Sequence, residues 1–339
     1  MRISNQRSIS VSKPNVGIVV RKSLRDRILS DWDLEKLESF ANVTINDEDR
    51  DIVDEEAAEF LNGMDGAMTS WNSGDLSPAI LEGVPTLKIW AYGAGTVKGK
   101  ICDEAWEKDI VVTSAAPAIA DDVAEMTMGF MTMGLRRVFS HSRAMREGEK
   151  KPDKTESRSL YRRTIGVISA SQVGQRVMRL LRPYQTRILL YDPFVTPERA
   201  EEFGAELADL ETIAREAEVV TVHAPKLDAT YHLWNETHFK LMRDDCVFIN
   251  TSRGANIDEA ALIAELQKGR FSAFLDVTDP EPPAMDSPLR RLPNVVLTPH
   301  CAGLQSYRIG ALVVEELRRF FANEDQLFQV RRELLDRLA

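Results

Sequence analysis

Residues 164–192 read TIGVISASQVGQRVMRLLRPYQTRILLYD, and this stretch decides the fold of the region around it. An apolar run at Ile165–Ile168 meets a turn of small residues, and a helical pattern begins at Gln172. A second apolar run, Ile188–Tyr191, ends on Asp192. This order of strand, turn, helix, strand and acid is typical of a dinucleotide-binding unit. Asp192 would take the ribose hydroxyls of the adenosine, and its charge favours NAD because it repels the 2′-phosphate of NADP.

The turn itself departs from the glycine fingerprint G-x-G-x-x-G, because its six positions read Ser-Ala-Ser-Gln-Val-Gly from Ser169 to Gly174. Gly174 keeps the third glycine, which lets the helix and the strand pack closely. We expect the hydroxyls of Ser169 and Ser171 to face the phosphates of a dinucleotide that binds more weakly than on a glycine turn. On these residues alone, a plain strand–helix turn without a ligand stays open, as does an ordinary strand-end acid at Asp192.

The composition narrows the class of protein. The 339 residues suggest two domains, and 43% apolar with 28% charged residues is usual for a globular chain. The net charge of −10 argues against a nucleic-acid or anionic-membrane partner, which it would repel. Three widely spaced cysteines give neither a disulfide framework nor a zinc spacing, which fits a reducing cytosol. We therefore expect a cytoplasmic protein without a metal, and a polar, disordered tail over residues 1–14.

Short apolar runs alternate with helical patterns along the chain, which predicts parallel sheets covered on both faces. The expected strands of the first series are Asn15–Val20, Val43–Asn46, Gly66–Ser70, Leu87–Ala91 and Ile110–Thr113. The expected strands of the second series are Ile165–Ile168, Ile188–Tyr191, Val219–His223, Cys246–Asn250, Phe271–Asp276 and Val295–Thr298. A long helix is predicted from Asp121 to about Phe139, an exposed connection between domains over 146–158, and a charged final helix over Glu324–Ala339.

Chemically useful side chains follow three strands of the second series. Arg253 follows one strand, Asp276 and Glu281 follow the next, and His300 follows the last. The carboxyl ends of parallel strands meet at one edge of a sheet, where ligands of such folds bind. An arginine suits a substrate carboxylate, a histidine exchanges protons near neutral pH, and a nearby glutamate holds one tautomer. Each residue alone has a structural reading: a salt bridge, a loop carboxylate or a packed histidine.

At these positions the sequence resembles the D-isomer-specific 2-hydroxyacid dehydrogenases over roughly residues 15–323. The strongest matches are INTSRGANIDEAAL (249–262), FLDVTDPEP (274–282) and LTPHCAG (297–303), supported by VAEMTMGFM (123–131) and HAPKLDATYHL (223–233). The resemblance implies an α/β fold of two doubly wound parallel-sheet domains, with a Rossmann cofactor domain inserted into a flavodoxin-like substrate domain. The implied bounds are 121–303 for the NAD-binding domain, and 15–120 with 304–339 for the substrate domain.

The resemblance also implies roles for individual residues. Arg253 would anchor the substrate, His300 would be the acid/base, and Glu281 would pair with His300. The implied NAD contacts are Ser171, Gln172, Val173, Asp192, Ala224, Pro225, Thr251, Ser252, Arg253, Asp276, His300 and Gly303. The implied substrate contacts are Tyr92, Gly93, Ala94 and Gly95, with Arg253 and His300. A small 2-hydroxy or 2-keto acid substrate and a homodimer are expected.

The substrate loop is a second departure from the family. Many relatives carry a basic or small polar residue where Tyr92 stands, so a phosphate-bearing substrate loses an obvious anchor. Trp90 and Tyr92 suggest an aromatic side of the pocket, or else two rings that merely pack between domains. Thr278 stands where relatives often have an aromatic residue, and nothing in the sequence explains it. Two other functions stay open: an inactive dinucleotide-sensing or scaffold protein, and an enzyme that has lost NAD binding through its serine turn.

Overall fold

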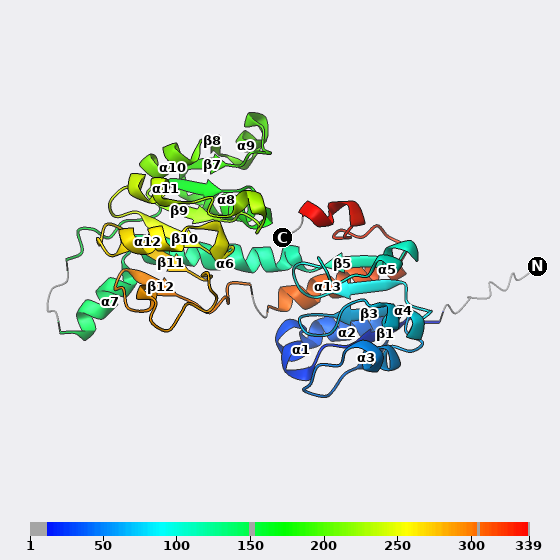
Figure 1. Ribbon diagram of the computed structural model, residues 1–339. Helices are drawn as coiled ribbons and strands as arrows, with labels where there is room; N and C mark the ends of the chain where they lie inside the picture. The colour runs from blue at the N-terminus through cyan, green and yellow to red at the C-terminus, as the bar shows by residue number, and fades with distance from the viewer. Residues whose placement is uncertain (1–11, 149–152, 304–305, 338–339) are drawn as a thin grey trace, which may run out of the picture. The chain divides into compact units, whose positions relative to one another are not determined.

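The computed structural model describes residues 12–148, 153–303 and 306–337 (Figure 1). The chain divides into two compact units, one made of Met1–Ile119 with Gln305–Leu338 and the other of Ala120–Leu304. The tail expected over residues 1–14 falls almost entirely outside the described residues. Among the described helices, every one is too short or too polar to cross a membrane.

The first unit is built on a five-stranded parallel sheet of order β2-β1-β3-β4-β5. Its strands are β1 (Asn15–Ile18), β2 (Asn42–Ile45), β3 (Gly66–Thr69), β4 (Ile89–Tyr92) and β5 (Val111–Ser114). Its helices are α1 (Lys22–Ile28), α2 (Asp31–Phe40), α3 (Asp54–Phe60), α4 (Pro78–Gly83), α5 (Asp103–Glu107) and α13 (Tyr307–Phe321). This strand order is that of a flavodoxin-like fold, as expected.

Alternate residues of β4 serve the two cores of this unit. Ile89 and Ala91 pack with α13 on one face, whereas Trp90 and Tyr92 pack with α3, α4 and α5 on the other. A sheet with helices on both faces buries both sets of side chains, which explains why its strands are apolar throughout.

The second unit is built on a seven-stranded parallel sheet of order β12-β11-β10-β9-β6-β7-β8. Its strands are β6 (Thr164–Ile168), β7 (Arg187–Tyr191), β8 (Glu206–Leu207), β9 (Val219–Val222), β10 (Val247–Asn250), β11 (Ser272–Leu275) and β12 (Val295–Leu297). Its helices are α7 (Val138–Arg146), α8 (Gln172–Leu181), α9 (Pro197–Phe203), α10 (Leu210–Glu216), α11 (Glu236–Leu241) and α12 (Glu259–Leu266), with α6 (Ala116–Leu135) entering from the first unit. The order reverses between β6 and β9, as in a Rossmann sheet.

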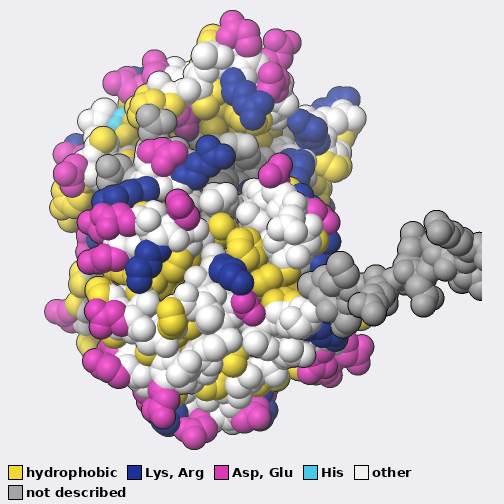
Figure 2. Space-filling model, turned by 90° about the vertical axis from the view of Figure 1, so that its right-hand side faces the viewer, with side chains coloured by type: hydrophobic (Ala, Val, Ile, Leu, Met, Phe, Trp, Pro, Cys, Tyr) yellow, Lys and Arg dark blue, Asp and Glu magenta, His cyan; other side chains and the backbone are white. Residues whose placement is uncertain are grey.

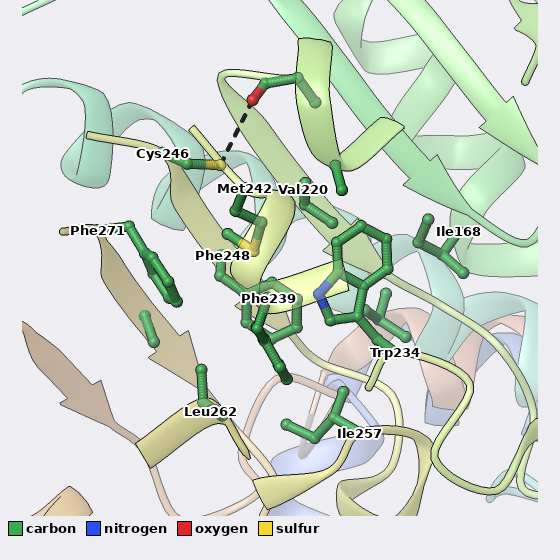
Figure 3. Packing of buried hydrophobic residues seen from close by; sticks show 14 of the residues in the cluster. Ile168, Val220, Trp234, Phe239, Met242, Cys246, Phe248, Ile257, Leu262 and Phe271 are labelled. Atoms are coloured by element: carbon green, nitrogen blue, oxygen red, sulfur yellow. Dashed lines mark hydrogen bonds between the residues drawn. The ribbon is translucent and has the colours of Figure 1, made fainter. Parts of the chain in front are cut away.

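Two apolar layers cover this second sheet. On one face, Trp234, Phe239, Phe248 and Phe271 form the aromatic centre of a cluster under α10, α11 and α12 (Figure 3). On the other face, Met131 of α6 is fully buried beside residues of α8. Met126, Met128 and Met133 are partly buried against the same cluster, so the methionines of α6 contribute to this core.

Three expectations about elements were wrong. The long helix begins at Ala116 rather than Asp121, and it breaks before α7 at Arg137, whose φ is +51° and whose guanidinium pairs with Asp245. Residues 146–158 lie inside the second unit and do not connect two domains, as their described part shows. Strand β8 was missed because its two residues are exposed and form no apolar run.

The predicted final helix is also absent from the described residues. Residues 324–331 are irregular, and Arg332–Arg337 form a short 3-10 helix. The buried carboxylate of Glu316 accepts the backbone N–H groups of Leu327 and Phe328 at 3.1 and 3.2 Å. The glutamate therefore satisfies two backbone donors of an irregular segment that runs beside β5.

The surface charge is mixed. On the face drawn in Figure 2, acidic and basic side chains are interspersed with small apolar groups. The formal charge of −10 is therefore not gathered into one acidic patch on that face.

Candidate active site

The turn after β6 keeps the packing of a dinucleotide turn without its first two glycines. A Cβ added to Gly174 would lie 2.1 Å from the carbonyl oxygen of Ser169, so only glycine fits there. Ser169 has a φ of +80°, the left-handed conformation that glycine adopts freely and serine adopts at a cost. The backbone path of the fingerprint is thus preserved even though its residues are not.

The two serine hydroxyls are engaged within the protein. Ser169 Oγ donates to Asp192 Oδ2 at 3.3 Å, and Ser171 Oγ caps α8 by accepting the N–H of Gly174 at 3.3 Å. The backbone N–H of Ala170 also donates to Asp192 Oδ2, at 2.8 Å. The expectation that both hydroxyls face the phosphates therefore needs correction for Ser169, whose proton points to a carboxylate.

The turn after β10 is fixed by the side chain of Asn250. Its Oδ1 accepts from the backbone N–H and the hydroxyl of Ser252 at 3.1 and 2.8 Å, while its Nδ2 donates to the carbonyl of Arg253 at 3.0 Å. The Nδ2 of Asn256 adds bonds to Ser252 Oγ and to the carbonyl of Ala224 at 3.2 and 2.7 Å. These two buried asparagines position the half-buried Arg253, and the sequence reading assigned them no role.

Thr251 has its hydroxyl proton committed by its neighbours. Thr127 Oγ1 donates to the carbonyl of Val123 at 2.8 Å and lies 3.0 Å from Thr251 Oγ1. Because a hydroxyl has one proton, Thr251 must donate to Thr127. Thr251 thus offers only acceptor positions to a ligand.

The next strand end packs directly on this turn. A Cβ on Gly254 would lie 2.1 Å from the carbonyl carbon and oxygen of Thr278, so the two loops touch backbone to backbone. Glu259, the first residue of α12, accepts the N–H of Asp279 through Oε2 at 3.0 Å. Burial, with the charge of Asp279 as a further cause, raises the pKa of Glu259. Sequence reasoning gave Glu259 no role, although it lies in the matched stretch 249–262.

Asp276 organises the loop that follows β12. Its buried carboxylate accepts from Thr298 Oγ1 at 2.5 Å and from the N–H groups of Cys301 and Ala302 at 3.0 and 2.9 Å. The N–H of His300 donates to the carbonyl of Asp276 at 2.9 Å, and His300 has a φ of +52°. The acid therefore fixes the conformation of the histidine loop.

His300 and Glu281 form the expected pair. His300 Nδ1 lies 2.6 Å from Glu281 Oε1, and about half of the imidazole is exposed. A carboxylate accepts but does not donate, so Nδ1 carries a proton in this bond. The second ring nitrogen, Nε2, is left to exchange a proton with a ligand.

His223, Ala224 and Pro225 follow β9 at the carboxyl end of the sheet. His223 is buried, its Nε2 lies 3.0 Å from Thr221 Oγ1, and its burial lowers its pKa to about 3. It is therefore a neutral, packed histidine rather than an exchangeable base. Ala224 is buried next to it, and Pro225 is half-buried at the loop surface.

The predicted substrate loop lies in the first unit, after β4. The rings of Trp90 and Tyr92 are buried among side chains of that unit, so neither forms an open aromatic wall. The N–H of Gly93 donates to the carbonyl of Thr69 at 2.6 Å and is not available to a ligand. Among the described residues, no acceptor faces the N–H groups of Ala94 and Gly95.

Comparison with known proteins identifies the family. Residues 128–302 match the model described as "D-isomer specific 2-hydroxyacid dehydrogenase, NAD binding domain". The chain belongs to the D-isomer specific 2-hydroxyacid dehydrogenase family. Its second unit therefore contains the nicotinamide dinucleotide domain of that family.

Relatives of this 2-hydroxyacid dehydrogenase family member carry several activities. A D-3-phosphoglycerate dehydrogenase of Archaeoglobus fulgidus is 32% identical, over 70% of this chain and 46% of its own length. A glyoxylate reductase of Korarchaeum cryptofilum is 31% identical, over 76% of this chain and 80% of its own. The solved D-lactate dehydrogenase of Escherichia coli is 26% identical with a TM-score of 0.69, over 94% of this chain and all of that one. The chain spans about half the length of the phosphoglycerate dehydrogenases it matches.

The turn of this family member fits a dinucleotide. The N–H groups of Gln172 and Val173, at the start of the ten-residue α8, have no acceptor among the described residues and suit a pyrophosphate.

The three cysteines Cys102, Cys246 and Cys301 are free thiols. Within the described ranges, His, Cys, Asp and Glu side chains do not gather into a set that could hold a metal ion.

Proposed function

We propose that this protein transfers a hydride between NAD(H) and a small D-2-hydroxyacid or 2-ketoacid. The observation that carries the proposal is the bond of 2.6 Å between His300 Nδ1 and Glu281 Oε1, because it leaves one imidazole nitrogen free for proton exchange. A buried structural histidine has no need of an exposed nitrogen, as the fully packed His223 of the same unit illustrates.

The cofactor would be held along the carboxyl edge of the second sheet. The N–H groups of Gln172 and Val173 take the pyrophosphate, and Asp192 takes the adenosine ribose. Ser171 is a further contact at the same turn. The contacts after the later strands are Ala224, Pro225, Thr251, Ser252, Arg253, Asp276, His300 and Gly303. When bound, NAD supplies the nicotinamide ring that accepts or gives the hydride.

The protein's own residues handle the substrate and the proton. Arg253 orients the substrate carboxylate and stabilises negative charge on the reacting oxygen. Asn250 holds the turn that carries this arginine. His300 Nε2 accepts the hydroxyl proton in oxidation and returns it in reduction. Glu281 accepts the hydrogen bond from Nδ1–H throughout, so it stabilises the imidazolium that forms in oxidation. In the first unit, the N–H groups of Ala94 and Gly95 remain candidate donors to a substrate oxygen.

The first unit supports a proposal for the substrate class. At the position of the predicted anchor, Tyr92 is buried, and the nearby Lys100 is already paired with Asp75 at 2.9 Å. A substrate phosphate therefore finds neither a cation at residue 92 nor an unpaired Lys100. We propose a small, unphosphorylated 2-ketoacid and a cytoplasmic enzyme.

The test is a titration of NADH followed by nicotinamide fluorescence, with glyoxylate, hydroxypyruvate and phenylpyruvate then added in turn. Binding with turnover supports the proposal, binding without turnover favours a dinucleotide-sensing protein, and no binding refutes both. The variant His300→Ala should lose at least about a hundredfold in kcat while its NADH affinity stays within a few-fold of wild type. The matched control His141→Ala removes an imidazole from α7, which lies beside the amino ends of the strands rather than their carboxyl ends, and should keep its turnover. Equal turnover of both variants would contradict the role of His300.

We also propose a homodimer, as the family resemblance implies. Helix α7 exposes Val138, Phe139 and Met145, an apolar group that a second copy would cover. Sedimentation equilibrium should give about twice the mass of one chain. A monomer at all concentrations would refute this assembly.

A further inference from the structure

Ser169 is strained, and its surroundings impose the strain. Its N–H donates to the carbonyl of Tyr191 at 2.7 Å, and its own carbonyl oxygen lies against Gly174. These two contacts hold the peptide groups on either side, which leaves residue 169 at a φ of +80°. The strand–helix packing therefore dictates the conformation, whichever side chain residue 169 carries.

The hydroxyl of Ser169 takes one hydrogen-bonding position on Asp192, the acid that would bind the ribose. A carboxylate has about four lone-pair positions, two on each oxygen. On Asp192, Oδ2 accepts from the N–H of Ala170 and from Ser169 Oγ, and Oδ1 accepts from the N–H of Phe194 at 2.9 Å. Three positions are thus taken, and the remaining one belongs to Oδ1.

A ribose with two adjacent hydroxyls needs more than one free hydrogen-bonding position on Asp192. Two hydroxyls that bind one carboxylate in parallel require one free position on each oxygen. With Oδ2 filled, only a single hydroxyl can bind Asp192 until the Ser169 hydroxyl moves away. A glycine at residue 169 would leave Oδ2 with a free position, because the remaining donor there is the amide of Ala170.

From this arrangement we infer that Ser169 is a specificity-determining residue that weakens recognition of the adenosine ribose by Asp192. The inference rests on the proposed dinucleotide site. The Ser169 hydroxyl and the ribose hydroxyl compete for one oxygen, so removing the former strengthens the binding of NADH. Because the competition involves ribose hydroxyls alone, a ligand without them gains nothing.

Two variants separate the hydroxyl from the strain. Ser169→Ala removes the hydroxyl but keeps a Cβ at the same φ, whereas Ser169→Gly removes both. Both should fold, because alanine matches serine in backbone strain and glycine relieves it, and the thermal midpoint of each variant checks this. Each is titrated with NADH and with an NADH analogue whose adenosine lacks both ribose hydroxyls.

The expected result is a Kd for NADH that falls about three- to tenfold in both variants, with the Kd of the dideoxy analogue unchanged. A gain in Ser169→Gly alone would assign the effect to backbone strain and overturn the inference. Unchanged or weaker NADH binding by Ser169→Ala would overturn it as well, as would an equal gain for the analogue. Failure of the proposed function looks different, since wild type and both variants would then show no saturable NADH binding.

Discussion

Acidification should destabilise the second unit through His223. This side chain is 4% exposed at the end of β9, and burial lowers its pKa from 6.5 to about 3. The folded state therefore keeps the ring neutral, whereas the unfolded chain binds a proton below about pH 6.5. Stability is highest above the unfolded pKa, and it falls as the pH drops from 6.5 towards 3.

The magnitude follows from proton linkage. At about pH 5, protonation of a histidine with an ordinary pKa lowers the free energy of the unfolded chain by about 2 kcal/mol, while the folded protein gains almost nothing. At about pH 7.5 the same difference is roughly 0.1 kcal/mol. Between these pH values, His223 should therefore remove about 2 kcal/mol from the free energy of unfolding.

The assay compares urea unfolding of wild type and His223→Gln at both pH values. Gln is chosen because its amide does not titrate and can still meet Thr221 Oγ1, the partner of the imidazole. Trp234 is fully buried in the same unit, so its exposure contributes to the change in tryptophan fluorescence on unfolding. Burial also lowers the pKa of His238, but that residue is present in both proteins and cancels in the comparison.

The variant should lose about 2 kcal/mol less than wild type on going to the lower pH. The matched control His232→Gln, which leaves the buried histidine in place, should keep the wild-type dependence. The reasoning fails if wild type and His223→Gln lose the same stability.

Two further predictions concern the loops around Arg253. Gly254→Ala would place a Cβ 2.1 Å from the backbone of Thr278, so we expect kcat at least about tenfold lower and about 2 kcal/mol less stability, measured by steady-state kinetics and urea unfolding. Wild-type values for both would contradict the close contact. Glu259→Ala removes the acceptor for the N–H of Asp279 and should lower kcat several-fold, whereas Glu259→Gln keeps an acceptor oxygen and should retain most of it. Equal kcat values for the two variants would contradict a role of the hydrogen bond.

The sequence predicted the two sheets because each depends on local patterns. Apolar runs such as Ile165–Ile168 and Val219–His223 locate the strands, and the parallel-sheet rule then brings their ends to one edge. The pairing of His300 with Glu281 came from the family resemblance, and the structure contains it. Strand β8 could not be found in this way, because Glu206 and Leu207 are exposed and pair only with the already formed β7.

The direction of side chains and their hydrogen-bond partners could not be predicted from the sequence. Trp90 and Tyr92 lie on a sheet that is apolar on both faces, so their alternation does not tell which ring lines a pocket. The hydroxyl of Ser169 was expected at a phosphate, but its acceptor is an acid 23 residues later. The irregular path after α13 depends likewise on Glu316, whose backbone partners lie 11 and 12 residues away.

The acids at and near the strand ends differ in their partners, since some bind backbone N–H groups and one binds an imidazole. Asp192 and Asp276 each accept two backbone N–H groups and so hold the loops at the strand ends, although Asp192 keeps one position on Oδ1. Glu259, at the start of α12, accepts the N–H of Asp279. Glu281 instead bonds to the imidazole of His300. A carboxylate that anchors several amides cannot move towards a proton without releasing a loop, whereas one that holds a single imidazole can follow its protonation. In the proposed mechanism the acid/base step therefore falls to His300 and Glu281, while the other three acids hold the loops around that pair.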